Sequence, residues 1–124
     1  MSPDSKDYTL AELCITAAAE AWRDAGEILA SGLGVVPRLA ASLAKSTFSP
    51  DLMMTDSECF LVIEPVPPGP RHGYTPRVEG WLPFRKVFEL LLSGRRHAMT
   101  MPTQIDRYGT TNISFIGSDP KKPK

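Results

Sequence analysis

The sequence contains little cysteine and little histidine, carries no net charge and lacks any long apolar run. Its 124 residues include two cysteines and two histidines, and fourteen basic residues balance fourteen acidic ones. Cys14 and Cys59 cannot build a disulfide framework, and His72 and His97 lack the spacing of a metal site. The neutral balance gives no indication of a nucleic-acid or membrane surface, so we expect neither as a partner and expect no metal.

The ends of the chain indicate its surroundings. Residues 1–7 are polar and lack the apolar core of a signal peptide, and no apolar run approaches the roughly 20 residues that cross a bilayer. Few cysteines and no leader together favour a reducing compartment, and we expect a cytoplasmic protein. We predict a disordered segment at 1–8, one α/β domain at 9–117 and a solvated basic tail at 118–124.

A helix is predicted at the start of the domain. Thr9 and Glu12 have the spacing of a capping box, in which each side chain bonds the free backbone N–H of the other residue. Apolar residues then recur every three or four positions, on one face that should be buried: Leu10, Leu13, Cys14, Ala17, Ala21 and Trp22. Cys14 is therefore interpreted as a small core residue rather than a reactive thiol.

The elements that follow alternate between strand and helix. A strand is predicted at 27–31, a helix at 37–47 with proline at its first position, a strand at 51–55 and an apolar run at 59–63. Six prolines within 65–83 predict a long loop. A third helix should span 83–93, and strands at 97–101 and 113–116 should be joined by a polar turn. This alternation is typical of a mostly parallel α/β sheet flanked by helices.

Ligands bind beyond the carboxyl ends of the strands in such a sheet. Gly32 and Gly34 precede a helix there, so their backbone N–H groups could receive a phosphate or a carbonyl oxygen; the alternative is a tight turn. Asp56 and Glu58 follow the next strand. A carboxylate at that position can act as a nucleophile or general base once desolvation raises its basicity; the alternative is a pair of turn residues.

The polar turn at 104–112 is the third segment expected at this edge. Asp106 and Asn112 suit local bonds from side chain to backbone, and Gly109 permits a positive φ. Asp106 is placed to pair with Arg107. This turn alone is interpreted as a well-capped connection between two strands.

Several motifs, taken together, resemble the β subunit of family I CoA-transferases. They are Thr-Asp-Ser-Glu at 55–58, Arg-Val-Glu-Gly-Trp-Leu-Pro-Phe at 77–84, Gly-Arg-Arg-His at 94–97, and Gln-Ile-Asp-Arg-Tyr-Gly at 104–109 followed by Asn-Ile-Ser at 112–114. The resemblance covers residues 10–117 and is strongest to a branch that hydrolyses a ring of a cholesterol-derived acyl-CoA in actinobacterial steroid breakdown. It implies a Rossmann-like sheet and an active site shared with an α subunit. Coenzyme A would be part of the substrate, with no permanently bound cofactor.

The resemblance also assigns roles to residues. Glu58 lies where the transferases have the glutamate that attacks the thioester to give an acyl anhydride and then a glutamyl-CoA thioester. The transferases continue with Asn-Gly, whereas this sequence continues with Cys59 and Phe60. That departure fits the hydrolytic branch, where the main acid/base carboxylate is expected from the α subunit. The candidates for binding substrate or CoA are Gly32, Gly34, Asp56, Gln104, Asp106, Arg107, Gly109 and Asn112.

The length of the chain departs from the family as well. The family's β subunits are about twice as long, although one domain of this size is ordinary. We therefore expect a truncated sheet with an open edge and exposed apolar faces, which predicts association. Two other functions stay open: a non-catalytic structural subunit that stabilises an α partner and, on fold analogy alone, a protein similar to sugar-phosphate isomerases.

Overall fold

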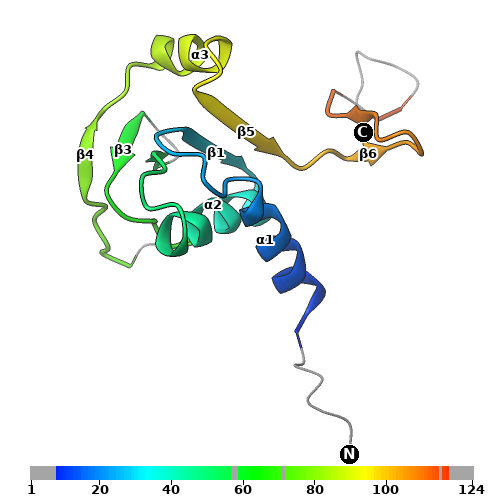
Figure 1. The fold of residues 1–124 in the computed structure, drawn as a ribbon, viewed down its shortest axis with the longest axis horizontal. Coiled ribbons are helices and arrows are strands. Elements are labelled where there is room, and N and C mark those ends of the chain that lie inside the picture. The colour runs from blue at the N-terminus through cyan, green and yellow to red at the C-terminus, as the bar shows by residue number, and fades with distance from the viewer. Residues whose placement is uncertain (1–7, 57–58, 71, 115, 118–124) are drawn as a thin grey trace, which may run out of the picture.

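In the computed structural model, helices and strands alternate along the chain (Figure 1). The structure describes residues 8–56, 59–70, 72–114 and 116–117. Its helices are α1 (Leu10–Glu20), α2 (Val35–Thr47) and α3 (Phe84–Leu92), and its strands are β1 (Leu29–Leu33), β2 (Met54–Thr55), β3 (Phe60–Val62), β4 (Val78–Trp81), β5 (Arg96–Thr100), β6 (Gln104–Ile105) and β7 (Thr111–Asn112).

None of the helices in those ranges is long and apolar enough to span a membrane. The residues at 1–7 and 118–124 lie outside the described part, so the expectations of a disordered start and a solvated tail stay predictions.

The strands confirm the predicted α/β class. β1 and β5 pair in parallel, in a register that sets Leu29 opposite Arg96. On its other side, Leu29 forms a parallel bridge with Met53, and the N–H of Ala30 donates to the Met53 carbonyl over 2.9 Å. β2, β3 and β4 continue from there as an antiparallel ladder. Joined by this bridge, the strands run in the order β5, β1, β2, β3, β4, with the parallel pairing at the β5 end and the antiparallel ladder at the β4 end.

The core lies between the sheet and two helices that are packed through alanine. Ala19 of α1 and Ala40, Ala41 and Ala44 of α2 are fully buried, as is Trp22 just beyond α1. Small side chains let two helices approach closely. The Ser49 hydroxyl donates to the Trp22 carbonyl over 2.8 Å inside this core, which satisfies a buried acceptor.

The predicted inner face of α1 is wrong except at Trp22, which is buried, and the capping box of the helix is confirmed. The Thr9 N–H donates to Glu12 over 2.7 Å, and the Glu12 N–H donates back to the Thr9 hydroxyl. Leu10, however, is 76% exposed, and Cys14 is exposed rather than part of the core. The helix is apolar around most of its circumference, so periodicity could not choose a face. Ala19 is the buried residue of α1, with Ala18 partly buried beside it, and Trp22 is the member of the predicted face that is buried.

Several of the predicted ranges moved, among them the strand expected at 51–55, of which only Met54–Thr55 forms β2, and one loop prediction failed. β1 begins two residues later than expected, and α2 begins at Val35, so that Pro37 occupies its third position rather than its first. β4 lies inside the predicted loop and pairs with β3. Residues 77–82 contain no proline, so their N–H groups remain available for a ladder.

The last predicted strand, at 113–116, is replaced by a hairpin of β6 and β7. Residue 115 is outside the described part, and its described neighbours are not in a strand. Asp106 Oδ1 accepts from the backbone N–H groups of Tyr108 (2.8 Å) and Thr110 (2.9 Å), and Gly109 has a φ of +84°. These bonds close a tight turn within the segment that was expected to link two longer strands.

Helix α3 leaves an apolar stripe exposed. Phe84, Phe88, Leu91 and Leu92 are all exposed, with Leu92 at 89%, and no residue of this fully described helix is buried. Figure 1 shows α3 at the rim of the sheet, away from α1 and α2. The expectation of exposed apolar faces is thus met, while the association that they favour stays a prediction.

Gly32 sits at the tightest contact between the sheet and α2. A Cβ at this position would lie 2.5 Å from the Arg38 nitrogen and 2.6 Å from the Pro37 carbonyl carbon. Both are backbone atoms, which no side-chain rotation can move. Only glycine lets β1 and the first turn of α2 come this close.

We predict that Gly32→Ala lowers the free energy of unfolding by about 1–3 kcal/mol, the usual cost of overpacking a core. Urea unfolding followed by circular dichroism measures the loss. Gly80→Ala is the matched control, because its Cβ would meet nothing nearer than a Leu61 methyl at 4.0 Å. Equal stability of Gly32→Ala and the unchanged chain would refute this account of the contact.

The Asp106 turn carries a pH prediction. The hydrogen bonds from the Thr110 and Tyr108 backbone lower the pKa of Asp106. The ionised carboxylate therefore stabilises the hairpin above about pH 4, the ordinary aspartate value, and this contribution is lost as the pH falls through the lowered pKa. We expect the amide NMR signals of Tyr108 and Thr110 to titrate with a midpoint below that value. Asp106→Asn should abolish the titration, and a midpoint at or above about 4 would contradict the assignment.

Candidate active site

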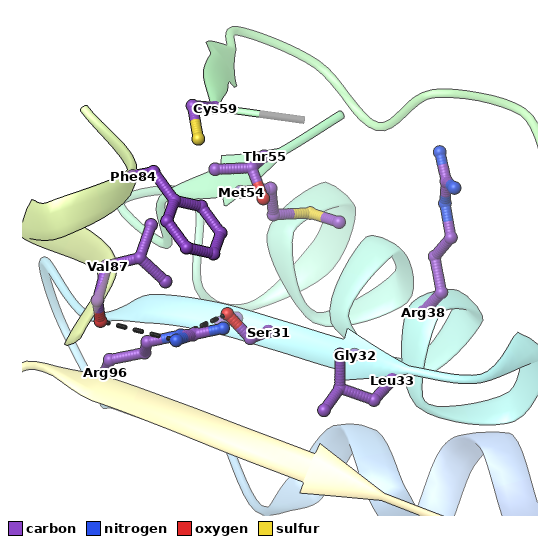
Figure 2. A pocket seen from close by; sticks show the side chains of 11 residues that line it. Ser31, Gly32, Leu33, Arg38, Met54, Thr55, Cys59, Phe84, Val87 and Arg96 are labelled. Atoms are coloured by element: carbon purple, nitrogen blue, oxygen red, sulfur yellow. Dashed lines mark hydrogen bonds between the residues drawn. The ribbon is translucent and has the colours of Figure 1, made fainter. Parts of the chain in front are cut away.

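A cleft of about 320 Å³ opens at the carboxyl ends of β1 and β2 (Figure 2). Ser31, Gly32 and Leu33 of β1 form its floor, and the first turn of α2 closes one end. Figure 2 shows Phe84 and Val87 of α3 extending over this floor toward β2. The cleft therefore lies where a parallel α/β sheet was expected to bind its ligands.

An ion pair ties α2 to the end of β2. Arg38 Nη2 lies 3.5 Å from Asp56 Oδ1, and the Asp56 residue is only 8% exposed. A largely buried carboxylate needs a partner of opposite charge, and a guanidinium beside it supplies that charge. The Asp56 N–H also donates to the Phe60 carbonyl over 3.0 Å, which links the two ends of the stretch 56–60. Asp56 is thus held through both its side chain and its backbone.

Cys59 and Thr55 face the cleft from the sheet side. Both line it, and Cys59 is half-buried with its sulfur directed toward α3 in Figure 2. The Cys59 carbonyl accepts from the Leu82 N–H over 2.7 Å, which fixes its backbone. Glu58, the carboxylate of greatest interest in the sequence, lies outside the described residues.

Arg96 connects α3 with the floor of the cleft. Its Nε donates to the Ser31 hydroxyl over 2.8 Å, and its Nη1 donates to the Val87 carbonyl over 3.3 Å. Figure 2 shows both bonds running along the floor. Since α3 buries none of its own residues, this bridge is a principal polar link between that helix and β1.

The two glycines of the candidate site have structural roles. Gly32 provides the close contact with α2 described above. Gly34 is the N-cap of α2 with a φ of +119°, and a Cβ there would lie 2.8 Å from the Met101 sulfur. Gly32 and Asp56 are brought to the same region, as expected for residues at the carboxyl ends of adjacent strands.

The remaining candidates are not brought to the cleft. Gln104, Asp106, Arg107, Gly109 and Asn112 belong to the β6–β7 hairpin, which Figure 1 shows well beyond the end of β5. The side-chain contacts that the structure describes for them lie within the hairpin. The Asn112 amide donates to the Gln104 side chain over 2.7 Å, and the Arg107 guanidinium stacks on the Tyr108 ring instead of pairing with Asp106. Within the described residues, this hairpin is a separate, exposed unit.

Sequence analysis missed Arg38 and Ser31. Ser31 is a buried hydroxyl in an apolar strand, and such a group needs a bonding partner. Arg38 is a cation in the first turn of a helix, where the helix dipole disfavours positive charge. Both placements are unfavourable by themselves. Each therefore indicates, from the sequence alone, that a specific interaction stabilises the residue.

The cleft is an apolar chamber with cationic side chains at its edge. Among the described residues, no group of three or more His, Cys, Asp or Glu side chains is placed to hold a metal ion. Among the described residues that line it, the charged groups are Arg38, which is compensated by Asp56, and Arg96, which bonds two neutral oxygens. A polarised neutral group that accepts hydrogen bonds suits this combination of apolar walls and nearby donors.

Comparison with known proteins supplies relatives for this arrangement. No protein-family model matches the chain. A cholesterol ring-cleaving hydrolase IpdB subunit of Mycobacterium tuberculosis is 46% identical over 109 residues, which cover 88% of this chain and 43% of that protein. The IpdB subunit of Rhodococcus jostii is 42% identical over 117 residues, covering 94% and 45%. The chain thus spans less than half the length of these relatives.

Solved structures agree with the sequences. The crystal structure of Rhodococcus jostii IpdAB matches with a TM-score of 0.78 at 41% identity, covering 95% of this chain and 46% of that one. A glutaconate coenzyme A-transferase from Acidaminococcus fermentans matches with a TM-score of 0.63 at 24% identity, covering 98% and 49%, and supports the fold alone. Over the portion that it spans, the chain is a homologue of the cholesterol ring-cleaving hydrolase IpdB subunits, the branch that its motifs resemble most strongly, and it shares the fold of a CoA-transferase.

Proposed function

We propose that this chain is the β-subunit-like part of a heteromeric enzyme that hydrolyses or transfers the acyl group of a CoA thioester in steroid or related carboxylic-acid breakdown. The observation that carries the proposal is the cleft at the carboxyl ends of β1 and β2, in a chain 46% identical to a ring-cleaving hydrolase subunit. An α subunit completes the active site in this proposal. Coenzyme A enters as part of the substrate, and the enzyme works in the cytoplasm, in keeping with its two free cysteines.

Glu58 is the reacting carboxylate in this proposal. It follows Asp56 by two residues, and Asp56 is anchored by Arg38 at the edge of the cleft. As a nucleophile, the Glu58 carboxylate would form a bond to the thioester carbonyl carbon while the C–S bond breaks and CoA leaves as the thiolate. In hydrolysis, water would provide the new oxygen, and the main acid/base carboxylate would come from the α subunit.

Hydrolysis or ring cleavage, rather than plain transfer, is the version that we favour. Cys59 and Phe60 replace the Asn-Gly pair that follows the transferase glutamate, so the polar contact and backbone freedom of that pair are absent. Cys59 instead has its carbonyl bonded to Leu82 and lines the cleft. Gln104, Asp106, Arg107, Gly109 and Asn112 remain proposed contacts to the CoA part, on an exposed hairpin.

A substitution of Glu58 in the assembled two-subunit enzyme tests the proposal. We expect Glu58→Gln to lower kcat by at least about 10²-fold, the usual contribution of a nucleophile or general base. Glu79→Gln, in the exposed strand β4, is the control and should leave kcat unchanged. Full activity of Glu58→Gln would instead support a non-catalytic structural subunit.

Mass spectrometry separates transfer from hydrolysis. Incubation of the assembled enzyme with acyl-CoA should leave Glu58 unmodified if hydrolysis is the reaction. A CoA adduct on Glu58 would show covalent transfer and would overturn the preference for hydrolysis.

A further inference from the structure

The cleft has walls suited to an uncharged apolar group. Its volume of about 320 Å³ is at the small end of ligand pockets, which range from about 300 to 1,000 Å³. Leu33 of β1, Met54 of β2, and Phe84 and Val87 of α3 contribute apolar surface from three different elements. A chamber of this size and lining cannot enclose the phosphates and nucleotide of coenzyme A, but it can enclose an alkyl chain or a small ring.

The charged side chains at the edge of the cleft leave its interior apolar. Arg38 is paired with Asp56 at 3.5 Å, so its charge is largely compensated. The Nε of Arg96 is directed at the Ser31 hydroxyl rather than into the chamber. The donors therefore flank the cleft, where a carbonyl could lie, while the interior remains apolar.

The roof of the chamber is set by one helix. Phe84 and Val87 are one turn apart on α3, so both face the floor formed by β1. The bond from Arg96 to the Val87 carbonyl and the bond from Arg96 to Ser31 fix the spacing between that helix and β1. The Phe84 ring fills the end of the space nearest Met54 and Thr55 in Figure 2. Its size consequently limits what the chamber accepts.

We propose that this cleft receives the apolar acyl part of the thioester, with Phe84 as the residue that determines the acyl size and Arg96 as the residue that positions the roof. The inference rests on the proposed function for the thioester itself. It adds the location of the acyl group, which lies on this chain against the apolar residues of β1, β2 and α3. The CoA part then lies outside the chamber.

The two cysteines provide an internal test. Cys59 lines the cleft, whereas Cys14 is exposed on α1. S-hexyl-CoA and S-methyl-CoA are thioethers that cannot be hydrolysed or transferred, and neither competes for a thiol reagent. The rates of iodoacetamide labelling at both cysteines are measured by peptide mass spectrometry in the presence of each probe, with the chain alone and with an α partner added.

We expect S-hexyl-CoA to slow labelling of Cys59 and not of Cys14. Half-protection should need at least about tenfold less S-hexyl-CoA than S-methyl-CoA, because removing even two of the five further methylenes from water gives about that factor. Equal protection by the two probes would assign the cleft to the CoA part and overturn the proposal. So would unchanged labelling of Cys59 in both preparations.

A pair of α3 variants locates the effect. Phe84 and Phe88 are both exposed and form an edge-to-face pair with centroids 5.3 Å apart, but only Phe84 lines the cleft. Phe84→Ala should enlarge the chamber, so that the longer thioether S-decyl-CoA protects Cys59 better than S-hexyl-CoA, and Phe88→Ala should leave S-hexyl-CoA the better of the two. An equal change in both variants would trace the size limit to the ring pair and overturn the role of Phe84.

The protection of Cys59 by the probes does not depend on catalysis. Glu58→Gln should keep the protection of Cys59 even where the activity of the assembled enzyme is lost. Protection with no Glu58-dependent activity would refute the catalytic proposal and leave the acyl site standing. Glu58-dependent activity with no protection would refute only the acyl site.

Discussion

The contact between Gly32 in β1 and the backbone of Pro37 and Arg38 in α2 determines where the groups around the cleft lie. Because no side chain separates them, the first turn of α2 rests directly on the sheet. Arg38 is thereby carried to the carboxyl end of β2, within reach of Asp56. The ion pair in turn holds the start of the stretch that carries the proposed reactive carboxylate. One missing methyl group thus connects the packing of the fold to the chemistry proposed for it.

The parts that sequence analysis predicted correctly are those governed by local rules. The capping box of Thr9 and Glu12 depends on two side chains and one turn of helix, and it forms as expected. The alternation of helix and strand up to residue 63 also follows from local patterning, and it gave the α/β class. The gathering of Gly32 and Asp56 at one edge followed from the parallel topology.

The predictions that failed concern features that tertiary packing decides. The local sequence was equally compatible with more than one arrangement at these places. The first helix offers apolar residues on more than one side, and only the fit of Ala19 against α2 selects the buried side. Prolines at 65–76 gave no information about the proline-free stretch that became β4. The ion pair of Arg38 and Asp56 spans 18 positions, and no spacing rule anticipates it. The cleft itself needs β1, β2 and α3 together, so no single motif could indicate its walls.

The alanine contact between α1 and α2 has a consequence for how the sequence can vary. Alanine has no rotamers to lose, so docking these helices costs no side-chain entropy. The same contact leaves no room for a longer side chain at Ala19, Ala40, Ala41 or Ala44, all of which are fully buried. Drift at these positions is therefore confined to residues about as small as alanine, while the exposed face of α1 is free to change. The helix pair should consequently evolve as two surfaces with very different rates of substitution.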